Sequence, residues 1–210
     1  MGGRLRCRDA GLSVRIISRI HILYIPLIVL HMFHVIKLNY HKFESAVIYT
    51  HLIGTRYYVR YCCRVAVYLY TESKILAGNI QALKYIEENA KKYGLYKLTR
   101  LPVPGAYHTQ LMQPALKSFG KILHTLEFND FRCQVYSNCK GHPYGNTSLI
   151  RKYLTRQIVS PVRWEQCMQL LYNRPAGTAF PRTFDVGSGG RMSTILKLIN
   201  TKAYEHCISV

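Results

Sequence analysis

A histidine that follows a glycine-containing turn is the residue of this sequence best placed to do chemistry. His108 lies in the stretch L-P-V-P-G-A-Y-H-T-Q-L-M-Q-P-A, which runs from Leu101 to Ala115. The stretch predicts a turn at Pro104-Gly105 followed by a helix, a position that would place an imidazole at the mouth of a cleft. A neutral imidazole can activate a hydroxyl nucleophile as a general base if an acceptor fixes its other nitrogen. The chain has nine histidines, however, so the residue type alone does not establish acyl transfer.

Histidine and cysteine residues show no spacing typical of a metal site. The seven cysteines include no C-x-x-C pair, and their positions relative to the nine histidines match no zinc-ligand pattern. An odd number of cysteines without a regular framework also argues against a disulfide-stabilised secreted domain. The sequence therefore predicts no metal site and favours a reducing compartment.

The chain is strongly basic, with 29 Lys and Arg against 10 Asp and Glu and a net charge of +19. Such a field attracts polyanions, acidic proteins and anionic membrane surfaces. Together with seventeen tyrosines and an apolar run near the N-terminus, it leaves open a basic nucleic-acid-binding or membrane-associated protein. No RNP-like, helix-turn-helix or zinc-finger pattern supports this alternative, so we rank it last and expect no nucleic-acid partner.

From about Arg64 onward the sequence alternates between strand and helix patterns. Strands are expected over 64–70, 74–77, 97–103, 133–136 and 183–186, and helices over 80–92, 110–126, 147–158, 164–172 and 191–200. Asn79 is expected to cap the first of these helices, and Gly94 to end it in a left-handed conformation. This alternation predicts an α/β architecture.

The first 62 residues do not follow this pattern. The run from Ile16 to Ile36 is apolar but contains Arg19, Pro26 and three histidines, which argues against a membrane-spanning helix. Five arginines up to position 19, against one aspartate, are compatible with a mitochondrial transit peptide. A third interpretation, which we favour, is that this segment is not a genuine part of the folded protein, for example because the start of the gene was wrongly assigned. We divide the chain into an unmatched segment 1–62, a domain 63–206 and a tail 207–210.

Four blocks resemble, in order, motifs of the malonyl-CoA:acyl carrier protein transacylases. The stretch around His108 is similar to that family's V-S-G-A-F-H-[ST]-x-L-M-x-P-A, and 135–138 to its V-Y-S-N strand. Residues 154–164 are similar to L-x-x-Q-x-x-x-P-V-x-W, and 184–189 to F-E-V-G-P-G. The resemblance covers 63–204 and is limited to the C-terminal portion of the family. It implies a partial acyltransferase fold: part of the ferredoxin-like small subdomain plus the C-terminal part of the α/β-hydrolase-like large subdomain.

The resemblance also implies roles for three residues. His108 would be the general base toward a serine, while the Gln157 carbonyl would orient its ring and the Gln157 amide would line the acyl pocket. Tyr107 stands where related domains that select malonyl over methylmalonyl carry a bulky aromatic. The implied reaction, in mitochondrial fatty acid biosynthesis, moves malonyl from malonyl-CoA through a serine ester to the phosphopantetheine thiol of acyl carrier protein, without a cofactor. Carriers of this kind are acidic, which suits a basic chain.

The nucleophile itself is not identified. Family members carry it in a G-x-S-x-G elbow, and the sequence contains no such string. The nearest, Gly11-Leu-Ser13-Val-Arg15, ends in arginine where the elbow needs a small residue. The family's carboxylate-binding arginine is not identified either. We therefore expect the chain alone to be inactive, and a catalytically inactive acyltransferase-like fragment remains an alternative.

Overall fold

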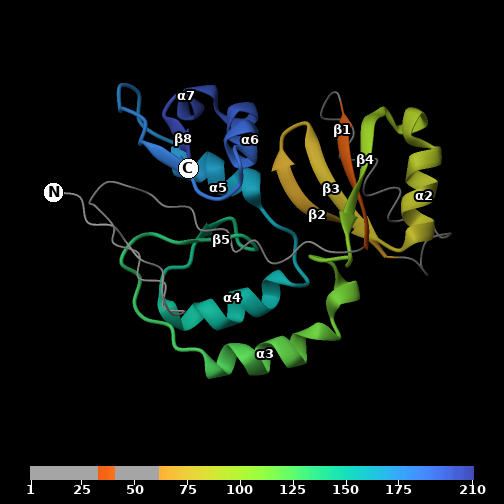
Figure 1. Cartoon of the computed structure of the whole chain (residues 1–210), viewed down its shortest axis with the longest axis horizontal. Coiled ribbons are helices and arrows are strands. Elements are labelled where there is room, and N and C mark those ends of the chain that lie inside the picture. The colour runs from red at the N-terminus through yellow and green to blue at the C-terminus, as the bar shows by residue number, and fades with distance from the viewer. Residues whose placement is uncertain (1–32, 41–61) are drawn as a thin grey trace.

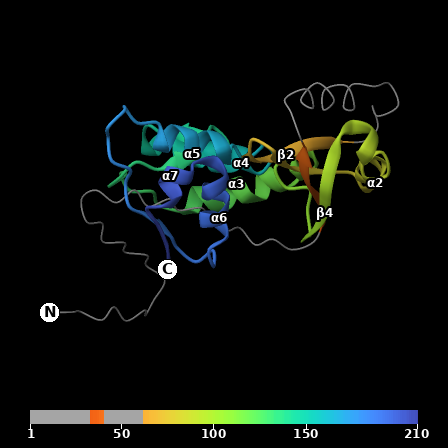
Figure 2. The ribbon, with the colours of Figure 1, turned by 90° about the horizontal axis from the view of Figure 1, so that it is seen from above.

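The computed structural model describes the backbone of residues 33–40 and the whole of residues 62–210. These residues form an antiparallel sheet carrying helix α2 and a second, mainly helical region (Figure 1). Seen from above, α2 and the helices α5 to α7 lie at opposite ends of the molecule (Figure 2). Ser13, the expected transit peptide and most of the apolar run lie outside the described residues. Within the described residues, no helix combines the length and apolar character needed to cross a membrane.

The antiparallel sheet has the strand order β2-β3-β1-β4. Its strands are β1 (Phe33–Tyr40), β2 (Cys63–Tyr70), β3 (Ser73–Gly78) and β4 (Leu95–Val103). The three strands predicted over 64–70, 74–77 and 97–103 are thereby confirmed, with ends shifted by one or two residues. A two-residue turn at Thr71 and Glu72 joins β2 to β3, as the polar residues between the two patterns predict.

Strand β1 is an unexpected inner strand of this sheet. Its Val35 is opposite Ala77 of β3 on one side and Leu101 of β4 on the other. The sequence pattern predicts no strand over these residues and places them in a segment separate from the domain. The preceding apolar run hides the alternation by which a strand is recognised, and both pairing partners are distant in sequence. Part of the segment 1–62 therefore belongs to the fold.

Helix α2 (Ile80–Glu88) covers one face of the sheet and is followed by the 3-10 helix η2 (Ala90–Tyr93). The buried residues of this contact are Leu76, Leu83, Ile86, Ala90 and Leu95. Gly94 adopts φ +64° and ends the helical segment as predicted. Asn79 occupies the N-cap position of α2 as predicted, but its side chain makes no capping hydrogen bond and accepts instead from the Cys62 amide at 2.7 Å. Asn79 thus secures the residue that enters β2.

The second region contains the remaining elements. They are η3 (Gln110–Met112), α3 (Ala115–Thr125), β5 (Tyr136–Ser137), β6 (His142–Pro143), η4 (Thr147–Leu149), α4 (Ile150–Gln157), α5 (Trp164–Tyr172), β7 (Thr183–Asp185), α6 (Arg191–Ile199), α7 (Thr201–Tyr204) and β8 (Cys207–Ser209). A buried cluster centred on Trp164, Met168 and Leu196 joins α5 to α6 and forms the core of this region.

Three expectations for this region need correction. The helix predicted over 110–126 is divided at Pro114, because proline lacks the amide hydrogen that would continue the helical hydrogen bonds. The strand predicted over 133–136 is reduced to Tyr136–Ser137, which pairs only with the short β6. The residues assigned to a tail include β8, which pairs in parallel with β7. The other predicted helices and the strand β7 are present within a few residues of their expected positions.

Hydrogen bonds and one buried ion pair join the two regions. The Tyr68 amide donates to the Val162 carbonyl at 2.9 Å, so the segment before α5 continues the sheet beside β2. Lys74 Nζ lies 3.1 Å from Glu165 Oε2 of α5 and also donates to the Tyr70 carbonyl at 2.6 Å. Both charged residues are buried, with relative exposures of 7% and 8%. The β2–β3 turn is therefore held against α5 by groups that water does not screen.

Candidate active site

His108 lies in the turn between β4 and η3 with a left-handed backbone, φ +64°. Such a conformation is unfavourable for a residue with a Cβ and requires support from its surroundings. The His108 amide donates to the Ile158 carbonyl at 2.8 Å, just beyond the end of α4. Its neighbour Thr109 is 1% exposed, and the Thr109 hydroxyl donates to the Ala106 carbonyl at 2.5 Å and accepts from the Leu111 amide at 3.3 Å. The turn thus holds His108 in one backbone geometry.

The imidazole of His108 is held by the backbone of a distant helix. Its Nδ1 lies 2.8 Å from the carbonyl oxygen of Gln157, the last residue of α4, which is 49 positions away in the sequence. A carbonyl only accepts hydrogen bonds, so Nδ1 must carry the proton when the ring is neutral. Nε2 then has a free lone pair and can accept a proton. The last carbonyls of a helix have no partner within that helix, which makes Gln157 a suitable acceptor.

The environment of His108 favours the neutral ring. Burial lowers the pKa of this histidine, because the charged imidazolium loses solvation. The carbonyls of Gln157 and Ser160 act in the opposite direction, since they stabilise the protonated ring, but burial is the larger effect. A neutral imidazole of fixed tautomer is the form that a general base needs at neutral pH.

The other two predicted site residues flank this histidine. Gln157 is 7% exposed and contributes its carbonyl to His108, so the structure brings these two residues together as expected. Tyr107 is half-buried and packs against a cluster formed by Ala66, Ala77, Val103 and Ala106, at the end of β4. The role of the Gln157 amide and of Tyr107 in acyl binding remains a prediction.

The sequence pattern does not point to Cys62 and Cys63 as possible site residues. Cys62 is close enough to Thr109 to form a hydrogen bond with its side chain, and Cys63 follows it in β2. Burial raises the pKa of both thiols, that of Cys63 to about 12. Both remain protonated at neutral pH, and a thiol is a far weaker nucleophile than a thiolate. Neither thiol is therefore ionised in advance for nucleophilic attack.

The glycine-containing block 184–189 forms a compact loop at the start of α6. Oδ2 of Asp185 accepts hydrogen bonds from the Ser188 hydroxyl at 2.6 Å and from the Ser193 amide and hydroxyl at 3.0 and 2.7 Å. Burial raises the pKa of Asp185, but these hydrogen bonds outweigh it and the net pKa is lowered. Gly187 adopts φ +79°, which a turn of this shape requires. A carboxylate of the chain itself thus occupies this helix start.

The described part of the chain holds no cluster of potential metal ligands. No group of three or more His, Cys, Asp or Glu side chains there is arranged to hold a metal ion. The chemistry that the geometry of His108 offers is proton transfer by a buried, oriented imidazole.

Comparison with solved structures defines the class of fold. The structure matches malonyl-CoA:acyl carrier protein transacylase from Clostridium perfringens with a TM-score of 0.72 and 21% identity, over 87% of this chain and 54% of that chain. It matches the transacylase from Streptococcus pneumoniae with a TM-score of 0.68 and 24% identity, over 84% of this chain and 54% of that chain. The fold is that of these acyltransferases, represented over about half of their length.

Comparison of sequences identifies the family more closely. No family model matches the chain. The probable mitochondrial malonyl-CoA-acyl carrier protein transacylase of Drosophila melanogaster is 42% identical over 148 residues, 70% of this chain and 39% of that protein. The mitochondrial enzyme of Homo sapiens is 38% identical over 143 residues, 68% of this chain and 37% of that protein. The matched part of the chain belongs to the malonyl-CoA-acyl carrier protein transacylase family, and the chain spans under two fifths of the length of these relatives.

Proposed function

We propose that the protein to which these residues belong transfers malonyl from malonyl-CoA to the phosphopantetheine thiol of acyl carrier protein, in mitochondrial fatty acid biosynthesis. The single observation that carries the proposal is the contact of 2.8 Å between His108 Nδ1 and the Gln157 carbonyl, which leaves Nε2 available as a base. The names of the relatives from Drosophila melanogaster and Homo sapiens support the substrates and the compartment. One of the matched structures is described as a malonyl-transacylase in complex with its acyl carrier protein, with a TM-score of 0.70.

In the proposed reaction His108 moves a proton twice in each half-reaction. Its Nε2 takes the proton of a serine hydroxyl while the serine oxygen attacks the thioester carbonyl of malonyl-CoA. The imidazolium then returns the proton to the departing thiolate of coenzyme A, which leaves a malonyl-serine ester. The thiol of acyl carrier protein enters by the same steps in reverse. Gln157 accepts from Nδ1–H throughout and stabilises the transient imidazolium. The serine is not assigned to any residue of this sequence.

A chimeric protein provides the direct test of this function. Residues 62–210 would replace the corresponding segment of the Drosophila melanogaster relative, which supplies the rest of the fold. The readout is transfer of radiolabelled malonyl from malonyl-CoA to acyl carrier protein. Malonyl transfer by the chimera supports the proposal, because its His108 and Gln157 come from this chain and must then be functional. A folded chimera that binds malonyl-CoA but transfers no malonyl supports the alternative, a catalytically inactive acyltransferase-like fragment, which the absence of a G-x-S-x-G string favours.

The lowered pKa of His108 predicts the pH dependence of this activity. The base acts only when unprotonated, so kcat/KM should rise with pH through the pKa of His108 in the free enzyme. Because burial lowers this pKa, the inflection should lie below about 6.5, the usual value for histidine. The measurement is kcat/KM of the chimera between about pH 5 and pH 8. An inflection above the usual value would show that the charged ring is the stabilised form, contrary to the burial seen here.

Tyr107 is expected to exclude the extra methyl group of methylmalonyl. In the chimera, Tyr107→Ala should raise kcat/KM for methylmalonyl-CoA relative to malonyl-CoA about tenfold, because discrimination of one methyl group corresponds to roughly 1–3 kcal/mol. The matched control is Tyr107→Phe, which keeps the ring and should leave the ratio unchanged. If both variants leave the ratio unchanged, Tyr107 serves only to pack against the end of β4.

A further inference from the structure

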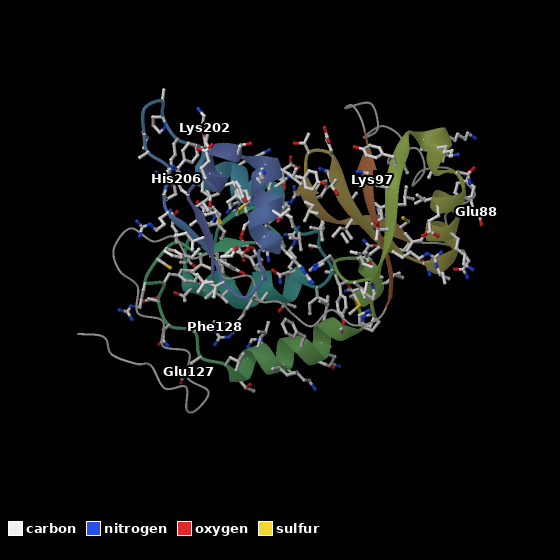
Figure 3. The ribbon with its side chains drawn as sticks, turned by 45° about the horizontal axis from the view of Figure 1, so that its top comes forward. Glu88, Lys97, Glu127, Phe128, Lys202 and His206 are labelled. Atoms are coloured by element: carbon white, nitrogen blue, oxygen red, sulfur yellow. The ribbon has the colours of Figure 1, made fainter. Side chains whose placement is uncertain are left out.

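A cavity of about 450 Å³ lies in the loop that follows α5. It is lined by Arg174, Pro175, Ala176, Gly177, Thr178, Ala179, Phe180 and Lys202. Lys202 belongs to α7, which lies at the end of the molecule away from the antiparallel sheet (Figure 3). The volume of the cavity falls in the range of about 300–1,000 Å³ that small-molecule sites occupy. His108 does not line it, so this cavity is separate from the candidate active site.

Two cations line this cavity without a carboxylate to neutralise them. Neither Arg174 nor Lys202 forms an ion pair with any Asp or Glu of the described residues. Nε of Arg174 is buried and has no hydrogen-bond partner among those residues. Because this nitrogen is closed off from solvent, an anion in the cavity would bind through the terminal Nη atoms of Arg174, which carry its other N–H donors. The lining thus has unused capacity to bind an anion.

The wall of the cavity is formed before any ligand arrives. The Thr178 amide donates to the Pro175 carbonyl at 3.1 Å, and Gly177 adopts φ +80°, the geometry of a tight turn that needs glycine. Phe180 packs against Tyr172 of α5 with ring centroids 6.3 Å apart. A preformed site loses little conformational entropy when it binds a ligand.

The chemistry of the lining defines one class of ligand. Arg174 can bind two oxygens of one anion, and Lys202 adds a second positive charge, a combination suited to a doubly charged phosphate. Pro175, Ala179 and Phe180 add an apolar side against which an organic group can pack. We propose that this cavity binds a phosphate monoester of a small organic molecule, with the phosphate between Arg174 and Lys202 and the organic part against Phe180. This inference does not depend on the proposed malonyl transfer.

Titration of the full chain with adenosine 5′-monophosphate tests the proposal. Isothermal titration calorimetry near physiological salt, where the Debye length is about 8 Å, limits diffuse attraction by the basic surface. We expect saturable binding of the monophosphate, competition by inorganic phosphate and no binding of adenosine. Lys202→Gln should weaken binding about tenfold, the effect of losing one charge-assisted contact. Lys202 is exposed, so this change should not disturb folding.

Two further variants separate a built site from general basicity. Arg174→Gln should abolish detectable binding, whereas Lys121→Gln, an exposed lysine of α3, should leave it unchanged. Equal weakening by the Lys121 and Lys202 substitutions would overturn the proposal in favour of diffuse charge attraction. Binding of adenosine as tight as that of its monophosphate, or no saturable binding of the monophosphate, would also overturn it.

Discussion

Replacing His108 by alanine in the chimera is expected to lower kcat for malonyl transfer about 10³- to 10⁴-fold. The general base would be lost, and what remains would come from binding and polar groups alone. Because the proton transfer is made in the transition state, KM for malonyl-CoA should change much less than kcat. The measurement is steady-state transfer to acyl carrier protein with the folded state checked by circular dichroism.

The backbone of His108 requires a second variant. The backbone at φ +64° is less favourable for alanine than for histidine, so loss of activity in His108→Ala could reflect a displaced turn. Asparagine adopts the left-handed region more readily and cannot act as a base, so His108→Asn should lose as much activity as His108→Ala. His124→Ala, an exposed histidine of α3, is the matched control and should retain full activity. Activity of His108→Asn within tenfold of the parent would contradict the assigned role.

Removing one partner of the buried pair Lys74–Glu165 should produce the largest loss of stability. In Glu165→Ala, Lys74 keeps the carbonyls of Tyr70 and Thr71 but loses the Glu165 carboxylate in a site only 7% exposed. Leaving a buried charge without its partner costs about 3–5 kcal/mol of unfolding free energy. Thr71 also loses the carboxylate oxygen that accepts from its hydroxyl at 2.7 Å. The measurement is the urea midpoint of the full chain at pH 7, with the transition followed by fluorescence.

Two controls test whether burial is the cause. Glu87→Ala removes the exposed ion pair with Arg100 and should shift the urea midpoint little, since water and salt screen that pair. The double substitution Lys74→Met with Glu165→Leu removes both charges and should recover most of the loss, because an apolar pair needs no solvation. If Glu165→Ala and Glu87→Ala shift the midpoint equally, the buried pair does not hold the β2–β3 turn against α5.

The two main residues of the candidate site, His108 and Gln157, could be predicted from the sequence. The motif around His108 gave its position after a turn, and the resemblance placed Gln157 as its partner; the structure has both residues in contact at 2.8 Å. Their catalytic roles remain a proposal. The motif could not reveal that His108 has a left-handed backbone or that burial lowers its pKa, because both depend on how α4 and β4 pack together.

Local patterns in the sequence determined most of the elements from Cys63 onward. Strands β2 to β4 and helices α5 and α6 follow from the spacing of apolar residues, and Gly94 from its freedom at positive φ, since these signals act within a few residues. Only the tertiary structure decided three other features: the inner position of β1, the hydrogen bond from the Cys62 amide to the Asn79 side chain, and the pairing of Lys74 with Glu165, 91 residues apart. The physical reason is the same each time: the partner of a strand edge, a polar side chain or a buried charge is chosen by proximity in the fold, and no local pattern encodes it.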